Sequence, residues 1–114
     1  MKKEPTEKEI ENSILAYLQT QKGFFWKNQS VGVWDNVKKT YRKPNNRFHV
    51  NGTADVLGCL PGGKFIALEV KTKRGRATQN QKDFLQRISM LGGKAAIVRS
   101  IDDVKAVLEE MNDL

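Results

Sequence analysis

Two short apolar runs, residues 53–60 and 64–71, flank the tripeptide Pro61-Gly62-Gly63. Apolar runs of this length around a proline–glycine turn are typical of a β-hairpin. Each run also contains an acid, Asp55 in the first and Glu69 in the second. Buried carboxylates are costly unless a cation or hydrogen bonds compensate them, so this hairpin constrains both the fold and the chemistry of the chain.

The relative position of the two acids depends on the register of the hairpin. If the loop has three residues, Leu60 faces Lys64 and Asp55 lies directly opposite Glu69. Lys71 then shares a face with Glu69, because side chains alternate along a strand. A loop one residue longer or shorter would place the two carboxylates on opposite faces of the sheet.

Helices are predicted at three places in the chain. Thr6 and Thr78 each begin a capping box, which predicts helices over residues 6–21 and 78–91. Ser100 is expected to start a third helix with an apolar face. Four apolar side chains of the second helix are predicted to face the core: Phe84, Leu85, Ile88 and Leu91.

The segments between these helices carry strand and loop signals. Residues 24–34 are rich in aromatic and β-branched side chains and predict one strand or two short ones. Residues 36–51 are expected to form a long basic loop, and residues 95–98 a short buried strand. The element order α-β-β-β-α-β-α predicts an α/β fold, with a mixed central sheet flanked by helices, in a single domain over residues 1–114.

The charge distribution narrows the class of partner. The net charge is +7, and only four acids, Asp35, Asp55, Glu69 and Asp83, lie between residues 12 and 100. This favours a polyanionic partner, with nucleic acid as the first candidate and a merely soluble basic surface as the alternative.

No apolar stretch is long enough to span a bilayer, so we expect a cytoplasmic protein without a membrane partner. Cys59 is the single cysteine, which excludes an internal disulfide and a cysteine-based zinc site, and it is expected in the core.

The opposed acids of the hairpin favour a metal site. Two facing carboxylates repel each other unless a divalent cation binds between them, and oxygen ligands suit Mg²⁺ or Mn²⁺. Such a metal polarises a phosphate oxygen and lowers the pKa of bound water. Lys71 is placed to position that water or to stabilise charge on the phosphate. The alternative is a simple ion pair between Lys71 and one of the acids on a half-exposed sheet.

Asp55 followed by Glu69-Val70-Lys71 resembles the D…(D/E)-x-K signature of the PD-(D/E)XK nuclease superfamily, although Ala54 replaces its proline. The whole chain looks like a small stand-alone VRR-NUC domain of phage or prophage type, which would act in a bacterial host cell. The resemblance implies a restriction-endonuclease-like αβββαβ core and the Val70 carbonyl as a further metal ligand. The other matching stretches are Glu11–Leu15, Trp26–Ser30, Tyr41–Lys43, Gly52–Gly58, Gly75–Gln81, Gly92–Ala95 and Val98–Val104.

The resemblance also implies two accessory site residues. A glutamate of the first helix completes the family's active site, as an outer or second-metal ligand, and Glu11 is the matching position. On a helical wheel Glu11 lies within the apolar stripe, between Leu15 and Leu18. Glu7 is the alternative, although the helix dipole alone explains an acid in the first turn. Gln81 has two compatible interpretations, as a capping-box residue and as an accessory beside the metal.

Two basic segments are predicted to bind nucleic acid through phosphate contacts and, for one tyrosine, through base stacking. No recognition helix stands out, so we expect recognition of shape rather than of base sequence. The resemblance implies a homodimer that cuts branched DNA such as Holliday junctions. Two alternatives stay open: a non-catalytic DNA-binding module of the same fold, and RNA as the substrate. The predicted contact residues are Lys38, Lys39, Tyr41, Arg42, Lys43, Arg47, Lys73, Arg74 and Arg76.

Overall fold

The computed structural model describes residues 3–29, 33–42 and 47–112, and within these ranges it contains three helices and six strands. The helices are α1 (Glu7–Leu18), α2 (Gln79–Met90) and α3 (Ile101–Asn112). The strands are β1 (Phe24–Lys27), β2 (Val33–Asp35), β3 (Thr40–Arg42), β4 (Val56–Cys59), β5 (Phe65–Val70) and β6 (Lys94–Val98). None of the helices in these ranges is long and apolar enough to cross a bilayer.

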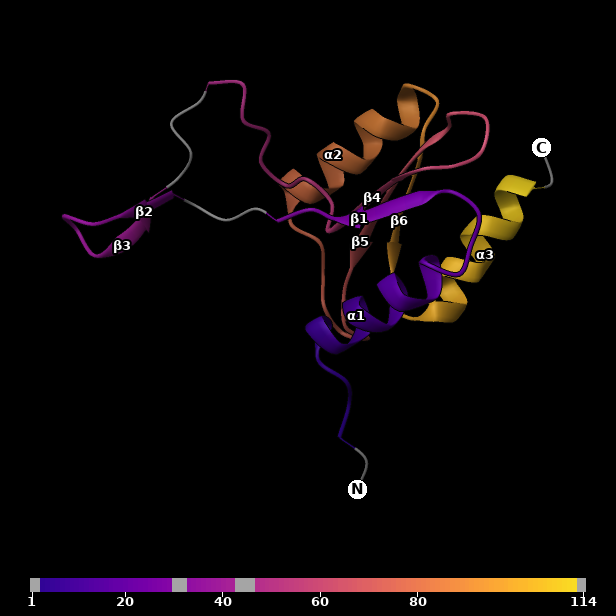
Figure 1. The fold of residues 1–114 in the computed structure, drawn as a ribbon, viewed down its shortest axis with the longest axis horizontal. Helices are drawn as coiled ribbons and strands as arrows, with labels where there is room; N and C mark the ends of the chain where they lie inside the picture. Colours follow the sequence, from indigo (N-terminus) through magenta and orange to yellow (C-terminus); the bar gives the residue numbers. More distant parts are fainter. Residues whose placement is uncertain (1–2, 30–32, 43–46, 113–114) are drawn as a thin grey trace.

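The central sheet has four strands in the order β1-β4-β5-β6 (Figure 1). β4 runs antiparallel to both β1 and β5, and β6 runs parallel to β5. A parallel pair needs a long crossover connection, and α2 supplies it between β5 and β6. The predicted α/β class, the mixed sheet and the αβββαβ core are therefore confirmed, with α3 added at the end of the chain.

The β4–β5 hairpin has the predicted register. The amide of Leu60 donates to the carbonyl of Lys64 at 2.8 Å, which closes a three-residue turn. The four residue pairs that follow along β4 and β5 keep the same register. Asp55 and Glu69 are consequently the next facing positions, at the open end of the hairpin.

The two faces of the sheet pack against different helices. Ile66 and Leu68 point to the face covered by α1 and α3, where the larger part of the core lies. Ala67 points to the other face and packs in a cluster with Leu85 of α2. Because side chains alternate along β5, Glu69 lies on the same face as Ala67. Figure 1 shows the sheet between α2 on one side and the α1–α3 pair on the other.

Both predicted capping boxes are present at the helix starts. The Oγ1 atom of Thr6 accepts from the Glu9 amide at 3.1 Å, and that of Thr78 accepts from the Gln81 amide at 3.2 Å. Each box also has its reciprocal bond from the N-cap amide to the third residue's side chain. These bonds satisfy amides that a helix start otherwise leaves without partners.

Three predictions about the less regular parts were wrong. Leu91 is 85% exposed because it is the C-cap of α2, where the backbone leaves the helical conformation. Cys59 is exposed because α2 covers β5 and β6 and leaves this end of β4 open. Residues 40–42 form strand β3 rather than part of a loop, and they pair with β2 in a separate two-stranded sheet.

Candidate active site

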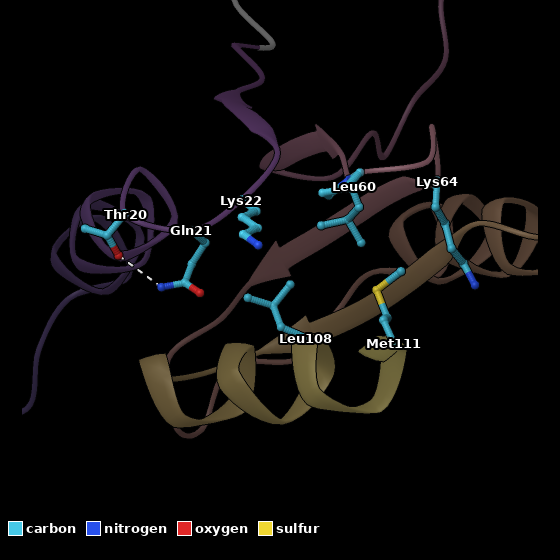
Figure 2. A pocket seen from close by; sticks show the side chains of 8 residues that line it. Thr20, Gln21, Lys22, Leu60, Lys64, Leu108 and Met111 are labelled. Atoms are coloured by element: carbon cyan, nitrogen blue, oxygen red, sulfur yellow. Dashed lines mark hydrogen bonds between the residues drawn. The ribbon is translucent and has the colours of Figure 1, made fainter. Parts of the chain in front are cut away.

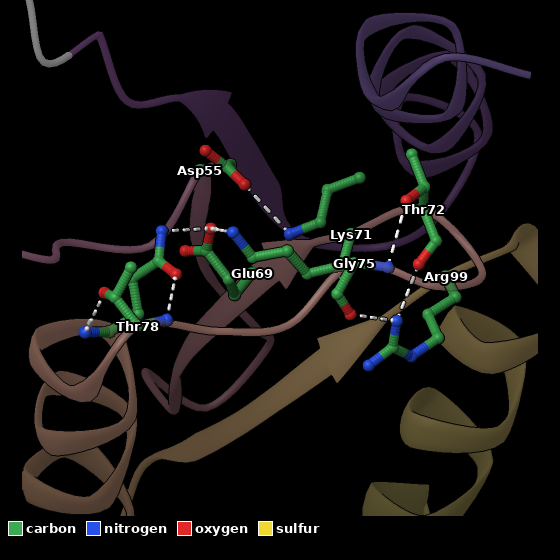
Figure 3. Close-up of polar contacts among 9 residues, drawn as sticks. Asp55, Glu69, Lys71, Thr72, Gly75, Thr78 and Arg99 are labelled. Atoms are coloured by element: carbon green, nitrogen blue, oxygen red, sulfur yellow. Dashed lines mark hydrogen bonds and ion pairs between the residues drawn. The ribbon is translucent and has the colours of Figure 1, made fainter.

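The open end of the β4–β5 hairpin brings four of the predicted site residues together: Asp55, Glu69, Lys71 and Gln81 (Figure 3). Glu69 is the centre of this group and is only 1% exposed. Its Oε1 atom accepts a hydrogen bond from Gln81 Nε2 at 3.0 Å and lies 3.7 Å from Lys71 Nζ. Lys71 is itself buried, at 9% exposure, so its ammonium is held near the carboxylate rather than in solvent.

Asp55 is fixed by the backbone on both sides of β4. Its Oδ2 atom accepts from the amide of Val70 at 2.9 Å, across the hairpin. Its carbonyl oxygen accepts from the amide of Asn28, just beyond β1, at 2.8 Å. These bonds hold the Asp55 carboxylate at the edge of the sheet although the residue itself lies outside the strand.

Glu69 has an altered proton affinity in this setting. Its pKa is raised from the ordinary 4.5 to about 8, mainly by burial and in addition by the adjacent Asp55 carboxyl group, while Lys71 acts in the opposite direction. Burial and a neighbouring carboxylate both disfavour the charged form of an acid. The Glu69 carboxyl group therefore holds a proton at neutral pH until a cation compensates its charge.

The donor atoms fit a hard divalent cation. Two buried carboxylate oxygens, Glu69 Oε2 and Glu11 Oε1, lack a hydrogen-bond partner within the described part of the chain. Such orphaned oxygens are costly in a metal-free protein and are suitable ligands for Mg²⁺ or Mn²⁺. In the described ranges, however, no three His, Cys, Asp or Glu side chains converge on one point. A metal held by Asp55 and Glu69 would need its remaining ligands from backbone carbonyls, water or phosphate.

Glu11 lies in the buried stripe of α1, as predicted, but has a different neighbour. It is 8% exposed, and its Oε2 atom forms an ion pair with Lys27 Nζ at 3.3 Å. Glu7 is exposed, which favours Glu11 as the inward acid of this helix. The sequence prediction missed Lys27, although its spacing of two from the buried Phe25 places it on the α1 side of β1.

The predicted nucleic-acid contacts fall into two groups of exposed side chains. Lys73, Arg74 and Arg76 lie in residues 72–76, the basic turn, which directly follows the buried Lys71. Lys38 and Lys39 lie in the turn between β2 and β3, and Arg47 stacks over the Phe48 ring at 4.7 Å. Lys43 and the side chains of Tyr41 and Arg42 fall outside the described residues.

A cavity of a different character lies elsewhere. Its volume is about 560 Å³, and it lies between the end of α1, the β4–β5 turn and α3 (Figure 2). It is lined by residues without a carboxylate, namely Thr20, Gln21, Lys22, Leu60, Pro61, Lys64, Leu108 and Met111. It is at the turn end of the hairpin, opposite to the acids, so it does not belong to the candidate active site.

The αβββαβ core, with an acidic pair and a lysine at the open end of its hairpin, defines a restriction-endonuclease-like class of fold. Comparison with solved structures finds a protein described as a VRR_NUC domain protein, with a TM-score of 0.63 and 19% sequence identity. The match covers 94% of this chain and 88% of that chain. The chain thus has the fold of a VRR-NUC domain, as the sequence predicted. No protein-family model and no curated protein matches the sequence.

Proposed function

We propose that this protein is a metal-dependent, structure-selective DNA endonuclease that hydrolyses phosphodiester bonds in branched DNA such as Holliday junctions. The observation that carries the proposal is the buried Glu69 carboxylate, held between Gln81 and Lys71 at the end where Asp55 is anchored. A purely structural sheet would gain more from apolar side chains at these buried positions. The buried acids and Lys71 are therefore better suited to a bound cation and an anionic substrate than to a structural role.

Each residue has a distinct role in this proposal. Asp55 and Glu69, with the Val70 carbonyl, would hold Mg²⁺ or Mn²⁺, which supplies Lewis-acid chemistry at phosphate and at bound water. Gln81 fixes the orientation of Glu69 by occupying Oε1, which leaves Oε2 for the metal. Lys71 places its ammonium at the attacked phosphate, where it orients the water or stabilises the developing negative charge.

Glu11 is assigned as an outer or second-metal ligand. Its unpartnered Oε1 atom is available, and its Oε2 atom is neutralised by Lys27. Lys27 directly precedes Asn28, whose amide binds the Asp55 carbonyl, so the two acidic sites are connected through the end of β1. A second cation would compete with Lys27 for the Glu11 carboxylate, whereas a substrate phosphate would compete with Glu11 for Lys27.

The substrate preference follows from where the cations lie. Lys73, Arg74 and Arg76 are next to the reaction centre and are suited to backbone phosphates, which carry no base sequence. Recognition would therefore depend on DNA shape.

A homodimer would present two such sites to the two strands of a junction. Phe24 and Trp26 of the edge strand β1 are exposed, with ring centroids 5.2 Å apart, and offer an apolar surface for the second copy. Sedimentation analysis of the wild type and of the Phe24→Thr/Trp26→Thr variant should show a dimer and a monomer respectively. A monomeric wild type at micromolar concentration would contradict the dimer.

The decisive experiment is cleavage of a four-way DNA junction, with linear duplex and matched RNA substrates in parallel. We expect the junction to be cut with Mn²⁺ or Mg²⁺ and to stay intact with EDTA. Lys71→Met keeps the length of the side chain and removes its charge, and should lower the rate by about 10³-fold. Lys105→Met, an exposed substitution on α3, is the control. Binding without cutting by the wild type would identify a non-catalytic DNA-binding module, and preferential cutting of RNA would overturn DNA as the substrate.

A further inference from the structure

An arginine outside the proposed mechanism holds the segment that follows Lys71. Arg99, directly after β6, directs its Nη1 atom at the carbonyl oxygens of Thr72 and Gly75, at 2.6 and 2.7 Å (Figure 3). The carbonyl of Lys73 lies 3.4 Å from the same nitrogen. A single guanidinium group thus binds several backbone oxygens of the basic turn.

The basic turn is also closed from within. The Gly75 amide donates to both the carbonyl oxygen and the Oγ1 atom of Thr72, each at 3.1 Å. Because the backbone oxygens point inward to Arg99, the three basic side chains of the turn are left exposed. The local geometry therefore fixes the backbone of the turn and presents its charges outward.

Arg99 is in turn held by the start of α3. Its amide donates to Asp103 Oδ2 at 2.8 Å, and the Asp103 amide donates to Ser100 Oγ at 3.2 Å. The bond from the Lys71 amide to the Val98 carbonyl, at 3.1 Å, ties the end of β5 to the strand that carries Arg99. The basic turn is thus attached to the same sheet that positions Lys71.

Arg99 differs from a neutral hydrogen-bond donor at this position by its positive charge. Among the described residues, no carboxylate forms a salt bridge with its guanidinium group. The anchor therefore adds a fourth positive charge beneath three others, and like charges at this range repel. A bound polyanion would offset that repulsion, so the arrangement suits an anionic partner.

We infer that Arg99 is a positioning residue for DNA, which preorganises the basic turn so that its cations meet backbone phosphates beside the reaction centre. The inference rests on the proposed function only in taking DNA as the substrate. Ordering the turn before binding reduces the entropic cost of binding. It also fixes the distance between the phosphate contacts and Lys71, on which the orientation of the reacting phosphate depends.

The test compares Arg99→Met with Arg87→Met, which removes the same group from an exposed position on α2. Amide exchange in residues 72–76 should become faster in Arg99→Met while the sheet amides keep their protection. KM for the junction should rise about tenfold, and the slope of log K against log salt should fall by more than the 0.9 of one phosphate contact. The Arg87→Met variant should match the wild type within about twofold in KM.

Arg99→Lys separates charge from geometry, because it keeps the charge and loses the planar fork. We expect it to restore KM only in part, with exchange in the basic turn still faster than in the wild type. Full restoration of KM while that exchange stays fast would overturn a positioning role. If Arg99→Met does not fold, Thr72→Val loosens the same turn by removing the Oγ1 bond, and should raise KM in the same direction.

The salt slope and amide exchange do not require cleavage, so the inference is separable from the proposed function. If the wild type binds DNA without cutting it, the proposed nuclease is wrong and Arg99 is still judged by binding. If the wild type cuts and Arg99→Met has the wild-type KM and salt slope, the inference is wrong and the nuclease stands. A wild type that binds no DNA would overturn both.

Discussion

The two basic segments of this protein have similar side chains and very different attachments. The basic turn follows Lys71 directly, and Arg99 holds its backbone oxygens. Within the described residues, β2 and β3 pair with each other in a sheet separate from the central one, and the hairpin projects from the body (Figure 1). Within it, Asp35 Oδ1 accepts from the amides of Val37 and Lys38 and closes the turn locally. Positive charge therefore indicates only a kind of partner, whereas attachment to the sheet fixes the charges of one segment beside Lys71 and leaves those of the other remote from it.

The first prediction concerns the acidic site next to the basic turn, where we expect the largest loss of activity. Asp55→Asn retains an oxygen that accepts from the Val70 amide but removes the carboxylate charge. Metal-dependent junction cleavage should fall by about 10³-fold with little change in thermal stability. Asp102→Asn, an exposed acid of α3, is the matched control. Wild-type activity in Asp55→Asn would show that Asp55 is not a metal ligand. The basic turn could then not be distinguished from the β2–β3 hairpin by its attachment to a metal site.

The second prediction concerns how closely the loop before β4 approaches α2. Gly52 has φ +78, and a Cβ atom there would lie 2.7 Å from the Gln81 backbone nitrogen. Gly62 has φ +91, with nothing within 4 Å of its Cβ position. Gly52→Ala should cost about 3 kcal/mol of unfolding free energy, from the left-handed backbone and the collision together.

Gly62→Ala is the control for the backbone conformation alone and should cost about 1 kcal/mol. Thermal unfolding of the two variants measures the difference, which reports the contact with α2. Gly52→Ala should also slow cleavage beyond its effect on stability, because Gly52 approaches the backbone of Gln81, whose side chain binds Glu69. Equal stability losses in the two variants would show that this contact is not tight.

The third prediction follows from the raised pKa of Glu69, which is about 8 instead of 4.5. The folded metal-free protein holds this proton and the unfolded chain does not, so the unfolding free energy falls as the pH rises from about 4.5 to about 8. Thermal unfolding in EDTA should show this loss, and Glu69→Gln, which is neutral throughout, should reduce it.

Metal binding should have the opposite pH dependence, because the cation displaces the Glu69 proton. The apparent affinity for Mn²⁺ should rise by about tenfold per pH unit and level off near the pKa. Calorimetry in buffers of different ionisation enthalpy measures the released proton directly. Mn²⁺ binding with no proton release near neutral pH would place the metal away from Glu69.

The last prediction compares how strongly the two basic segments contribute to DNA binding, and its effects are the smallest. Lys73→Gln/Arg74→Gln should reduce the salt slope of DNA binding by about 1.8, the value for two phosphate contacts. Lys38→Gln/Lys39→Asn removes the same charge from the β2–β3 turn, and asparagine tolerates the positive φ of 54° at Lys39. We expect this pair to weaken binding by only about threefold. Equal effects of the two pairs in fluorescence anisotropy would break the distinction between the segments.

The regular elements of the core were predictable because their signals are local. Capping boxes at Thr6 and Thr78 mark the helix starts, and the Pro61-Gly62-Gly63 turn sets the hairpin register from adjacent residues alone. The errors lie where exposure depends on what a distant element covers. Leu91 follows the apolar period of α2 but falls just after its last turn, and no local pattern reveals that α2 leaves the end of β4 uncovered at Cys59.

Local patterns predicted the fold class, the inward face of Glu11 and, with a three-residue loop, the facing positions of Asp55 and Glu69, because strand alternation and the helical period are short-range properties. The partners of these side chains depend on how the elements pack: Gln81 for Glu69, Lys27 for Glu11 and Arg99 for the basic turn. Those contacts join residues from separate elements, between 12 and 27 positions apart in the chain. They exist only once the helices and strands have packed, and no short-range pattern in the sequence encodes them.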